Sequence, residues 1–172
     1  MYKPNDLIVY GNTGVCRVMD ITTRDDLDIA VKGRLYYVLR PLYQDCIISA
    51  PVESEKVYIR PIMRADEVDK LIDSIPSINA EVFSSRVLRE LDEHYDALIK
   101  THDCATILEL TMSLYKKKAE AEKSGKKFGI VDAKYLARAE ELLFGEFAAA
   151  LGIERDEVVD YIADRVERHT EQ

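Results

Sequence analysis

Lysine and arginine side chains are the groups in this sequence whose spacing points most clearly to a chemistry, which is contact with phosphate. Residues 113–138 hold eight basic residues and only three acidic ones. Clusters of this kind neutralise the phosphates of nucleic acid. The chain of 172 residues carries a net charge of −8, so this positive stretch lies on a repelling background. The charges therefore predict a weak DNA contact that needs help from another partner.

The lysines of this stretch also have a purely structural explanation. They lie at the end of an expected helix and in the loop after it, and positive side chains at such an end complement the helix dipole. The sequence leaves both explanations open for Lys116, Lys117 and Lys118.

No other reactive side chains have a spacing that favours catalysis or metal binding. The cysteines are odd in number, far apart and without a CxxC pair, which argues against a disulfide framework and a zinc site. The histidines lie on different segments without metal-ligand spacing. These residues are Cys16, Cys46, Cys104, His94, His102 and His169. We expect buried free thiols, no enzymatic activity, no cofactor and no metal.

The elements that must position these residues change in character near Met63 and Arg64. The first part contains five short runs rich in Val, Ile, Tyr and Leu, separated by turn-formers, which predicts strands. Five strands in so short a stretch indicate a small Tudor/SH3-like β-barrel. The runs are 7–10, 15–22, 35–40, 46–50 and 57–62. Because a small barrel leaves a strand edge accessible, protein recognition is expected, although packing on the chain's own helices is the alternative.

The second part predicts five amphipathic helices, so the fold class is α+β, with a barrel at 1–63 and an all-α domain at 64–172. Apolar residues recur at three- and four-residue spacing in each expected helix. Asp66, Asp103 and Asp132 are expected to begin the first, third and fourth helices, and Gly152 ends the fourth. The second helix is expected from 84 or 85 to 100, and the fifth from about 156.

Composition favours a globular protein, since 47% of the residues are hydrophobic and 33% are charged. The apolar stretches are far shorter than the roughly 20 residues that cross a bilayer. The amino terminus has no basic-then-apolar export signal. We therefore expect a cytoplasmic protein without membrane contact.

Three stretches carry a resemblance to a known family. They are KPNDLIVYGNTGVCRV at 3–18, APVESEKVYIRPIM at 50–63 and FGIVDAKYLARAEELLFGEFAAALGIERDEVVDYI at 128–162. The first resembles the opening of CarD/CdnL-type bacterial transcription regulators, the second the end of their first domain, and the third their closing helices. The order matches that of the family and the stretches lie in both halves of the chain.

The resemblance implies a Tudor-like domain that binds the β subunit of RNA polymerase, and a helical domain that contacts promoter DNA. Such a regulator stabilises the open promoter complex without catalysis and is associated with the nucleoid through polymerase. In this picture Arg24 matches a family arginine at the polymerase interface. A second interface arginine is replaced here at Ser49. The polymerase-binding residues that the resemblance implies are Arg24, Ile48, Ser49 and Pro51.

The DNA half departs from the family pattern, because relatives insert a tryptophan into the minor groove and this chain has no tryptophan. Phe83 is the best local candidate for the wedge, since phenylalanine can also unstack bases, but a core role for it is equally open. Arg86 and Arg89 match in kind the basic residues that flank the family's wedge. The expected DNA-binding residues are Phe83, Arg86, Arg89, Lys116, Lys117, Lys118, Lys126 and Lys127.

A second hypothesis keeps polymerase binding but gives the helical half another task. In it, the helical domain is an adaptor that recruits another protein through its acidic terminal helix. The sequence also leaves open whether the chain is a monomer or a strand-exchanged dimer.

Overall fold

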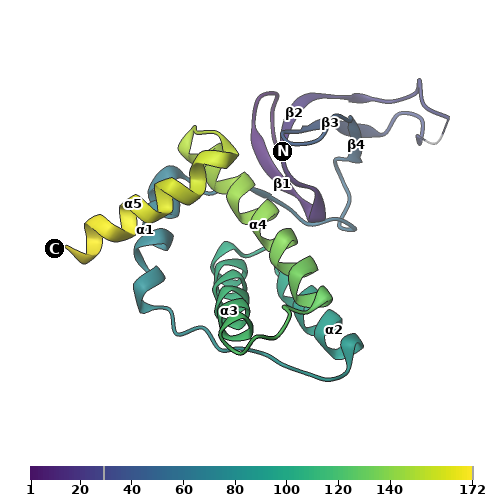
Figure 1. The fold of residues 1–172 in the computed structure, drawn as a ribbon. Helices are drawn as coiled ribbons and strands as arrows, with labels where there is room; N and C mark the ends of the chain where they lie inside the picture. Colours follow the sequence, from purple (N-terminus) through teal and green to yellow (C-terminus); the bar gives the residue numbers. More distant parts are fainter. Residues whose placement is uncertain (29, 172) are drawn as a thin grey trace. The chain divides into compact units, whose positions relative to one another are not determined.

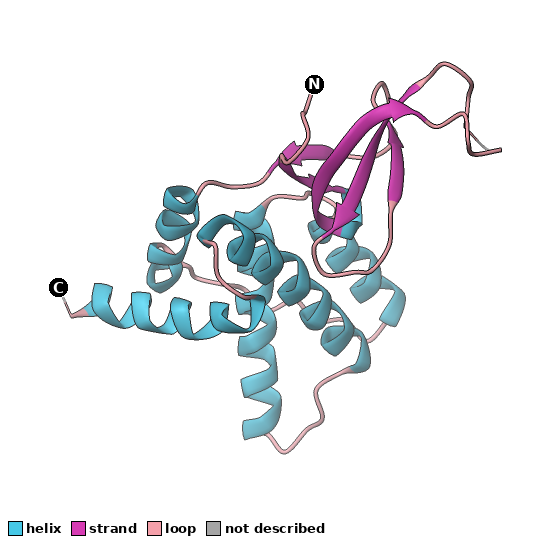
Figure 2. Ribbon diagram, turned by 90° about the horizontal axis from the view of Figure 1, so that it is seen from above, coloured by secondary structure: helices cyan, strands magenta, loops and turns pink. Residues whose placement is uncertain are grey.

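The structure is a computed structural model that describes residues 1–28 and 30–171. It divides into two compact units, Met1–Met63 and Arg64–Gln172. The described part of the first unit contains the five strands, and that of the second contains five α-helices (Figures 1 and 2). The predicted α+β class is therefore confirmed.

The strands of the first unit form one antiparallel sheet with the order β4-β3-β2-β1-β5. They are β1 Leu7–Tyr10, β2 Gly14–Thr23, β3 Leu35–Pro41, β4 Ile48–Pro51 and β5 Ile59–Pro61. Within the described residues the edge strands β4 and β5 do not pair with each other, so the predicted Tudor-like barrel takes the form of an open five-stranded sheet. The edge strands have only four and three residues and each ends in a proline, which lacks the N–H needed to extend a ladder.

One face of this sheet forms the core of the unit. Side chains alternate along each strand, so every second residue points to the same side. The buried cluster consists of Ile8, Cys16, Val18, Tyr37, Leu39 and Ala50. The register between β2 and β3 shifts between Val18 and Asp20, and such a bulge increases the local bend of the strand.

Gly11, in the turn between β1 and β2, cannot be replaced without strain. Its φ is +45°, and a Cβ atom there would lie 2.8 Å from Cγ1 of Val57. We expect Gly11→Ala to lower the free energy of unfolding by about 1–2 kcal/mol or more, because the left-handed conformation and the overlap both oppose a side chain. Urea denaturation measures this loss.

Gly33 provides the matched control for this prediction. Its φ is +76°, but a Cβ atom there would meet no heavy atom within 4 Å. Gly33→Ala should therefore cost only the conformational strain and less than Gly11→Ala. Equal losses for the two variants would contradict the role given to the Val57 contact.

The helices of the second unit are packed around α4, which contacts each of the other four (Figure 1). The elements are α1 Ala65–Asp73, α2 Leu88–Ile99, α3 Cys104–Lys123, α4 Ile130–Leu151 and α5 Val158–Thr170. Ala139, Leu143 and Phe147 of α4 are fully buried and form the centre of this core. Within the described residues, none of the helices is long and apolar enough to cross a membrane.

Two predicted helix ends are confirmed, and the other predicted ends differ from the observed ones by a few residues or more. The Asp103 carboxylate caps α3 by accepting from the Thr106 N–H at 3.1 Å, and Gly152 ends α4 with a left-handed conformation. Asp66 and Asp132 lie inside the first turns of α1 and α4 and do not precede these helices. Helix α5 begins at Val158, after a short 3-10 turn.

Helix α2 begins at Leu88, later than predicted, because Ser85 makes local bonds of its own. Its hydroxyl accepts from the Val87 N–H at 3.1 Å and donates to Glu90 at 2.6 Å. Serine hydroxyls that bond nearby backbone groups in this way favour a turn before the helix.

Helix α3 continues to Lys123, later than predicted, because lysine, alanine and glutamate are strong helix formers. Lys116, Lys117 and Lys118 therefore lie within the helix and not in its last turn. Since the helix dipole acts mainly on the terminal turn, it does not explain these three lysines.

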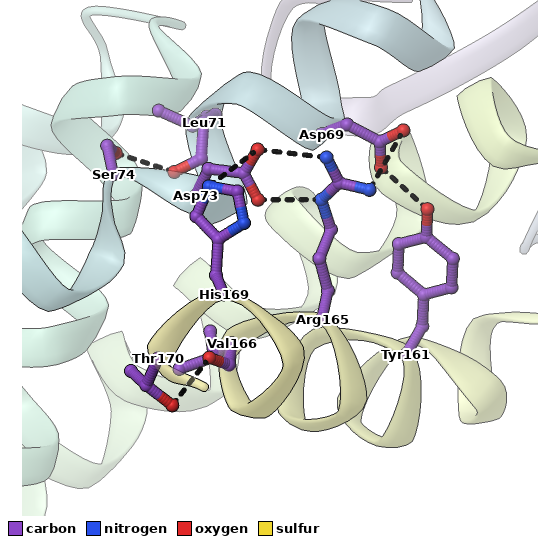
Figure 3. Close-up of polar contacts among 9 residues, drawn as sticks. All are labelled: Asp69, Leu71, Asp73, Ser74, Tyr161, Arg165, Val166, His169 and Thr170. Carbon is purple, nitrogen blue, oxygen red and sulfur yellow. Dashed lines mark hydrogen bonds and ion pairs between the residues drawn. The ribbon is translucent and has the colours of Figure 1, made fainter. Parts of the chain in front are cut away.

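Helix α5 is joined to α1 by a row of polar contacts (Figure 3). The Tyr161 hydroxyl donates to Asp69 at 2.6 Å, and the Arg165 guanidinium donates to both oxygens of Asp73 at 2.7 and 2.9 Å. His169 lies 3.6 Å from the same Asp73 carboxylate. Only Val158 of α5 is fully buried, so these contacts contribute much of the attachment of the helix.

We expect the stability that Asp73 contributes to disappear at acid pH. The hydrogen bond from Arg165 lowers the pKa of the Asp73 carboxyl below its usual value. A lowered carboxyl pKa gives stability that is complete above the unfolded value of about 3.8 and is lost as the pH falls below it. Asp73→Asn should cost about 1 kcal/mol at pH 6 and almost nothing near pH 2.

Thermal unfolding of wild type and Asp73→Asn over this pH range measures the difference. The exposed Asp160, on the same helix as Arg165, offers a control substitution to asparagine. A stability difference between wild type and Asp73→Asn that did not change with pH would contradict the prediction.

Candidate functional site

The four residues expected at the polymerase interface are brought together in the first unit. Ile48, Ser49 and Pro51 form most of the edge strand β4. Nη1 of Arg24, just after β2, donates to the Ser49 hydroxyl at 2.9 Å. The strand order places β3 between β2 and β4, so the Arg24 side chain reaches across the sheet to its edge.

The pairing register separates these residues onto the two faces of the sheet. Ser49 is opposite Val38, whereas Ile48 is opposite the core residue Leu39. Ile48 accordingly packs against the core cluster of the unit. Arg24 and Ser49 therefore lie on the face away from the core, and Ile48 is mainly a packing residue.

Asp26 fixes the orientation of the Arg24 guanidinium. The guanidinium donates to both oxygens of the Asp26 carboxylate, at 3.1 and 3.2 Å. The bond from Arg24 lowers the pKa of Asp26, so the pair is charged at neutral pH. Only 19% of the Arg24 side chain is exposed. A guanidinium held in this way is preorganised for a partner that approaches the edge.

Exposed apolar side chains lie near the same edge. Their exposure was not predicted from the sequence. Ile47 is 55% exposed directly before β4, and Leu35, at the start of β3, is 44% exposed. Among the described residues β4 pairs only with β3, so its outer backbone groups are open to another strand. The free cysteine next to Ile47, Cys46, is exposed, whereas Cys16 and Cys104 are buried. Ile47 and Leu35 lie inside the predicted strands 46–50 and 35–40, and the sequence carries no signal that their side chains are exposed.

Phe83, the predicted wedge, is half-buried and packs against two other rings of the helical unit. Its ring stacks on His94 with 3.7 Å between the centroids and meets Tyr95 edge-on. Burial lowers the pKa of His94, so the stacked imidazole is neutral at pH 7. The structure thus gives Phe83 the packing role that the sequence had left open.

The most exposed apolar residues near Phe83 are at the first turns of α2 and α4. Val87, Leu88 and Ile130 are 52%, 65% and 90% exposed. One turn further on, Asp92 of α2 accepts from Lys134 and Tyr135 of α4. The two helices therefore begin at the same end of the unit, as Figure 1 also shows. We call Val87, Leu88 and Ile130 the apolar tip.

Most of the predicted basic residues lie at the surface near this tip. Arg86 and Arg89 flank Val87 and Leu88, and the Arg89 side chain is 85% exposed with a surface ion pair to Glu93. Lys126 and Lys127 are exposed in the loop that leads to Ile130. Exposed cations around exposed apolar side chains are the combination found in proteins that bind the DNA minor groove.

The three lysines of α3 are divided by the helix. Lys116 and Lys118 are exposed, although Nζ of Lys116 lies 3.5 Å from the Ala80 carbonyl oxygen. Lys117 points inward, where its ammonium pairs with Asp132 at 2.9 Å and donates to the Phe83 carbonyl at 3.0 Å. Lys117 therefore belongs to the interior of the unit, and we leave it out of the candidate DNA surface.

The comparisons with known proteins concern mainly the first unit. Residues 2–63 match the family model of the CarD-like/TRCF RID domain. The match ends where the first compact unit ends, at Met63. No curated protein matches the chain. In the part of the chain that the structure describes, no group of three or more His, Cys, Asp or Glu side chains could hold a metal ion.

Proposed function

We propose that the chain is a transcription regulator that docks on the polymerase β subunit, because residues 2–63 match the family model of the CarD-like/TRCF RID domain, an RNA polymerase-interacting domain. The family match is the observation that carries this proposal. We further propose that the helical unit contacts promoter DNA and stabilises the open complex. Such a regulator acts in the cytoplasm, on the nucleoid.

The docking surface in this proposal is the outer edge of β4 together with Arg24. The edge offers backbone hydrogen bonds to an added strand, and Arg24 and Ser49 offer polar contacts beside it. Ile47 supplies exposed apolar area at the same place. Aromatic, apolar and arginine side chains at the centre of an interface usually contribute most of its affinity.

The DNA surface in this proposal is the apolar tip with the exposed basic residues around it. Leucine and isoleucine side chains act as wedges between base steps in several minor-groove binders. Leu88 and Ile130 are free to take this role, whereas the Phe83 ring is occupied by its stack on His94. The surrounding contacts to phosphate come from Arg86, Arg89, Lys116, Lys118, Lys126 and Lys127.

The expected affinity for free DNA and the effective concentration on the polymerase favour a DNA contact that forms only when the chain is docked. An acidic protein with few phosphate contacts binds free duplex weakly, and salt weakens it further. Docking of the first unit raises the local DNA concentration to roughly millimolar, which makes a weak contact useful. A preference of about 1–3 kcal/mol for melted DNA shifts the open population about 5- to 150-fold, whereas equal binding to both states shifts nothing.

Two measurements with purified components test the proposal. Retention of the chain by polymerase core enzyme at low salt tests docking, and the lifetime of the open complex with and without the chain tests the DNA contact. We expect retention and a longer lifetime. Failure of retention would remove the whole proposal. Retention with an unchanged lifetime would favour the adaptor hypothesis, in which the helical unit recruits another protein.

A further inference from the structure

The helical unit contains a buried polar cluster that bonds to the segment leading to the apolar tip. Asp132 is 4% exposed, and its Oδ1 accepts from the Tyr95 hydroxyl at 2.6 Å and from Nζ of Lys117 at 2.9 Å. Nζ of Lys117 also donates to the Phe83 carbonyl at 3.0 Å and to the Tyr95 oxygen at 3.4 Å. We call Tyr95, Lys117, Asp132 and the Phe83 carbonyl the Asp132 lock.

Each donor of the Lys117 ammonium group in this lock has an acceptor. An ammonium group has three donors, and Lys117 directs them at Asp132, the Phe83 carbonyl and the Tyr95 oxygen. Burial, followed by the bond to Asp132, raises the pKa of Tyr95, so its hydroxyl remains a donor. The lock therefore joins α2, α3 and α4 to one backbone carbonyl of an irregular segment.

That segment, residues 79–87, has no helix or strand of its own. Its Ala80 side chain is buried, and the Phe83 ring stacks on His94. Arg86 follows three residues after Phe83, and Val87 and Leu88 of the apolar tip come directly after Arg86. The bond to Lys117 therefore anchors the chain at Phe83, a few residues before the tip.

Stability alone does not explain a buried ion pair at this place. Taking two charges out of water costs about as much as their attraction returns, and apolar residues of the same volume often stabilise a core equally well. Three directed donors, in contrast, fix one geometry. We propose that Lys117 and Asp132 are positioning residues that keep residues 83–89 in the conformation that meets DNA. This inference rests on the proposed function.

The test compares wild type with the double variant Lys117→Met/Asp132→Asn. The asparagine keeps an oxygen for the Tyr95 hydroxyl and leaves no buried charge, so the unit should still unfold cooperatively. Lys117→Met alone would leave Asp132 as an uncompensated buried charge and would unfold the unit, which makes it unsuitable. The control is Arg86→Ala/Arg89→Ala, which removes proposed DNA contacts and leaves the lock intact.

Hydrogen exchange of backbone amides and the open-complex lifetime are measured for each protein. In the double variant, amides of residues 80–88 should exchange about tenfold faster or more, while those of the α3 and α4 centres keep their protection. The increase in open-complex lifetime caused by this variant should be at least about fivefold smaller than that caused by wild type. Its retention by core enzyme should be unchanged. The arginine control should lose lifetime without faster exchange.

Two results would overturn the inference. Unchanged exchange in residues 80–88 would show that the lock does not hold the segment, and faster exchange with a full lifetime extension would show that DNA binding does not need it. A wild-type chain that is retained by core enzyme but gives no extension would contradict the proposed function and the DNA role of the lock. In that case the exchange data would still decide whether the lock orders the segment.

Discussion

Arg24→Glu is expected to abolish retention of the chain by RNA polymerase core enzyme while the fold survives. In wild type the guanidinium bonds Ser49 and both oxygens of Asp26. A glutamate at this position removes the donors and places a second carboxylate beside Asp26 at the edge of β4. Arginines at interface centres often contribute 2 kcal/mol or more, so a loss of about thirtyfold or more in affinity is expected.

Retention on immobilised core enzyme at several salt concentrations measures this loss. Arg60→Glu is the matched control, because it makes the same charge change on β5, at the opposite edge of the sheet. Circular dichroism should give the same spectrum for both variants. Equal retention of Arg24→Glu and Arg60→Glu would exclude the β4 edge as the docking surface.

The triple variant Lys118→Glu/Lys126→Glu/Lys127→Glu is expected to remove the effect on the open complex without changing retention. All three side chains are exposed, so their replacement leaves the core of the unit intact. Each lost phosphate contact lowers the slope of log K against log salt by about 0.9, and the new carboxylates add repulsion. Lys117 is kept, since a glutamate there would face the buried Asp132 carboxylate.

The open-complex lifetime at two salt concentrations checks this prediction. Lys70→Glu/Lys100→Glu reverses exposed charges of the same unit on α1 and at the end of α2, and should leave the lifetime extension nearly intact. If the triple variant extends the lifetime as wild type does, the helical unit acts on something other than DNA. That result would favour the adaptor hypothesis.

Features that depend on neighbouring residues could be predicted from the sequence. Asp103 caps α3 by bonding the Thr106 N–H three residues later, and Gly152 ends α4 because glycine accepts a left-handed conformation. The predicted start of α2, at 84 or 85, was too early. Ser85 bonds Val87 and Glu90, and these bonds delay the helix. That competition between turn and helix is local too, but the hydrophobic pattern alone does not reveal it.

Features that depend on distant residues could not be predicted. The openness of the sheet depends on whether β4 and β5 pair, and the prolines that end both strands do not decide this by themselves. Lys117 was grouped with its neighbours because all three carry the same charge, yet Asp132, fifteen residues further on, draws it into the core. Asp132 itself was taken for a helix cap, since its true partners, Tyr95 and Lys117, lie on other helices.

The candidate sites also divide into features that neighbouring residues determine and features that distant residues determine. Arg24 was found through a family resemblance, whereas its bond to Ser49 depends on the register of three strands. Phe83 was chosen as a wedge because it is aromatic, and its partner His94 lies on the following helix. Nothing in the sequence singled out Leu88 or Ile130, and only the fold shows that these two side chains are exposed.

The distribution of thiols has a practical consequence for fluorescence work. Burial raises the pKa of the Cys16 thiol to about 12 and keeps it unreactive, and Cys104 is buried as well. Cys46 is exposed two residues before β4. A maleimide dye should thus label the native sequence selectively at one position, and its emission would report in real time when another protein covers this edge of the sheet.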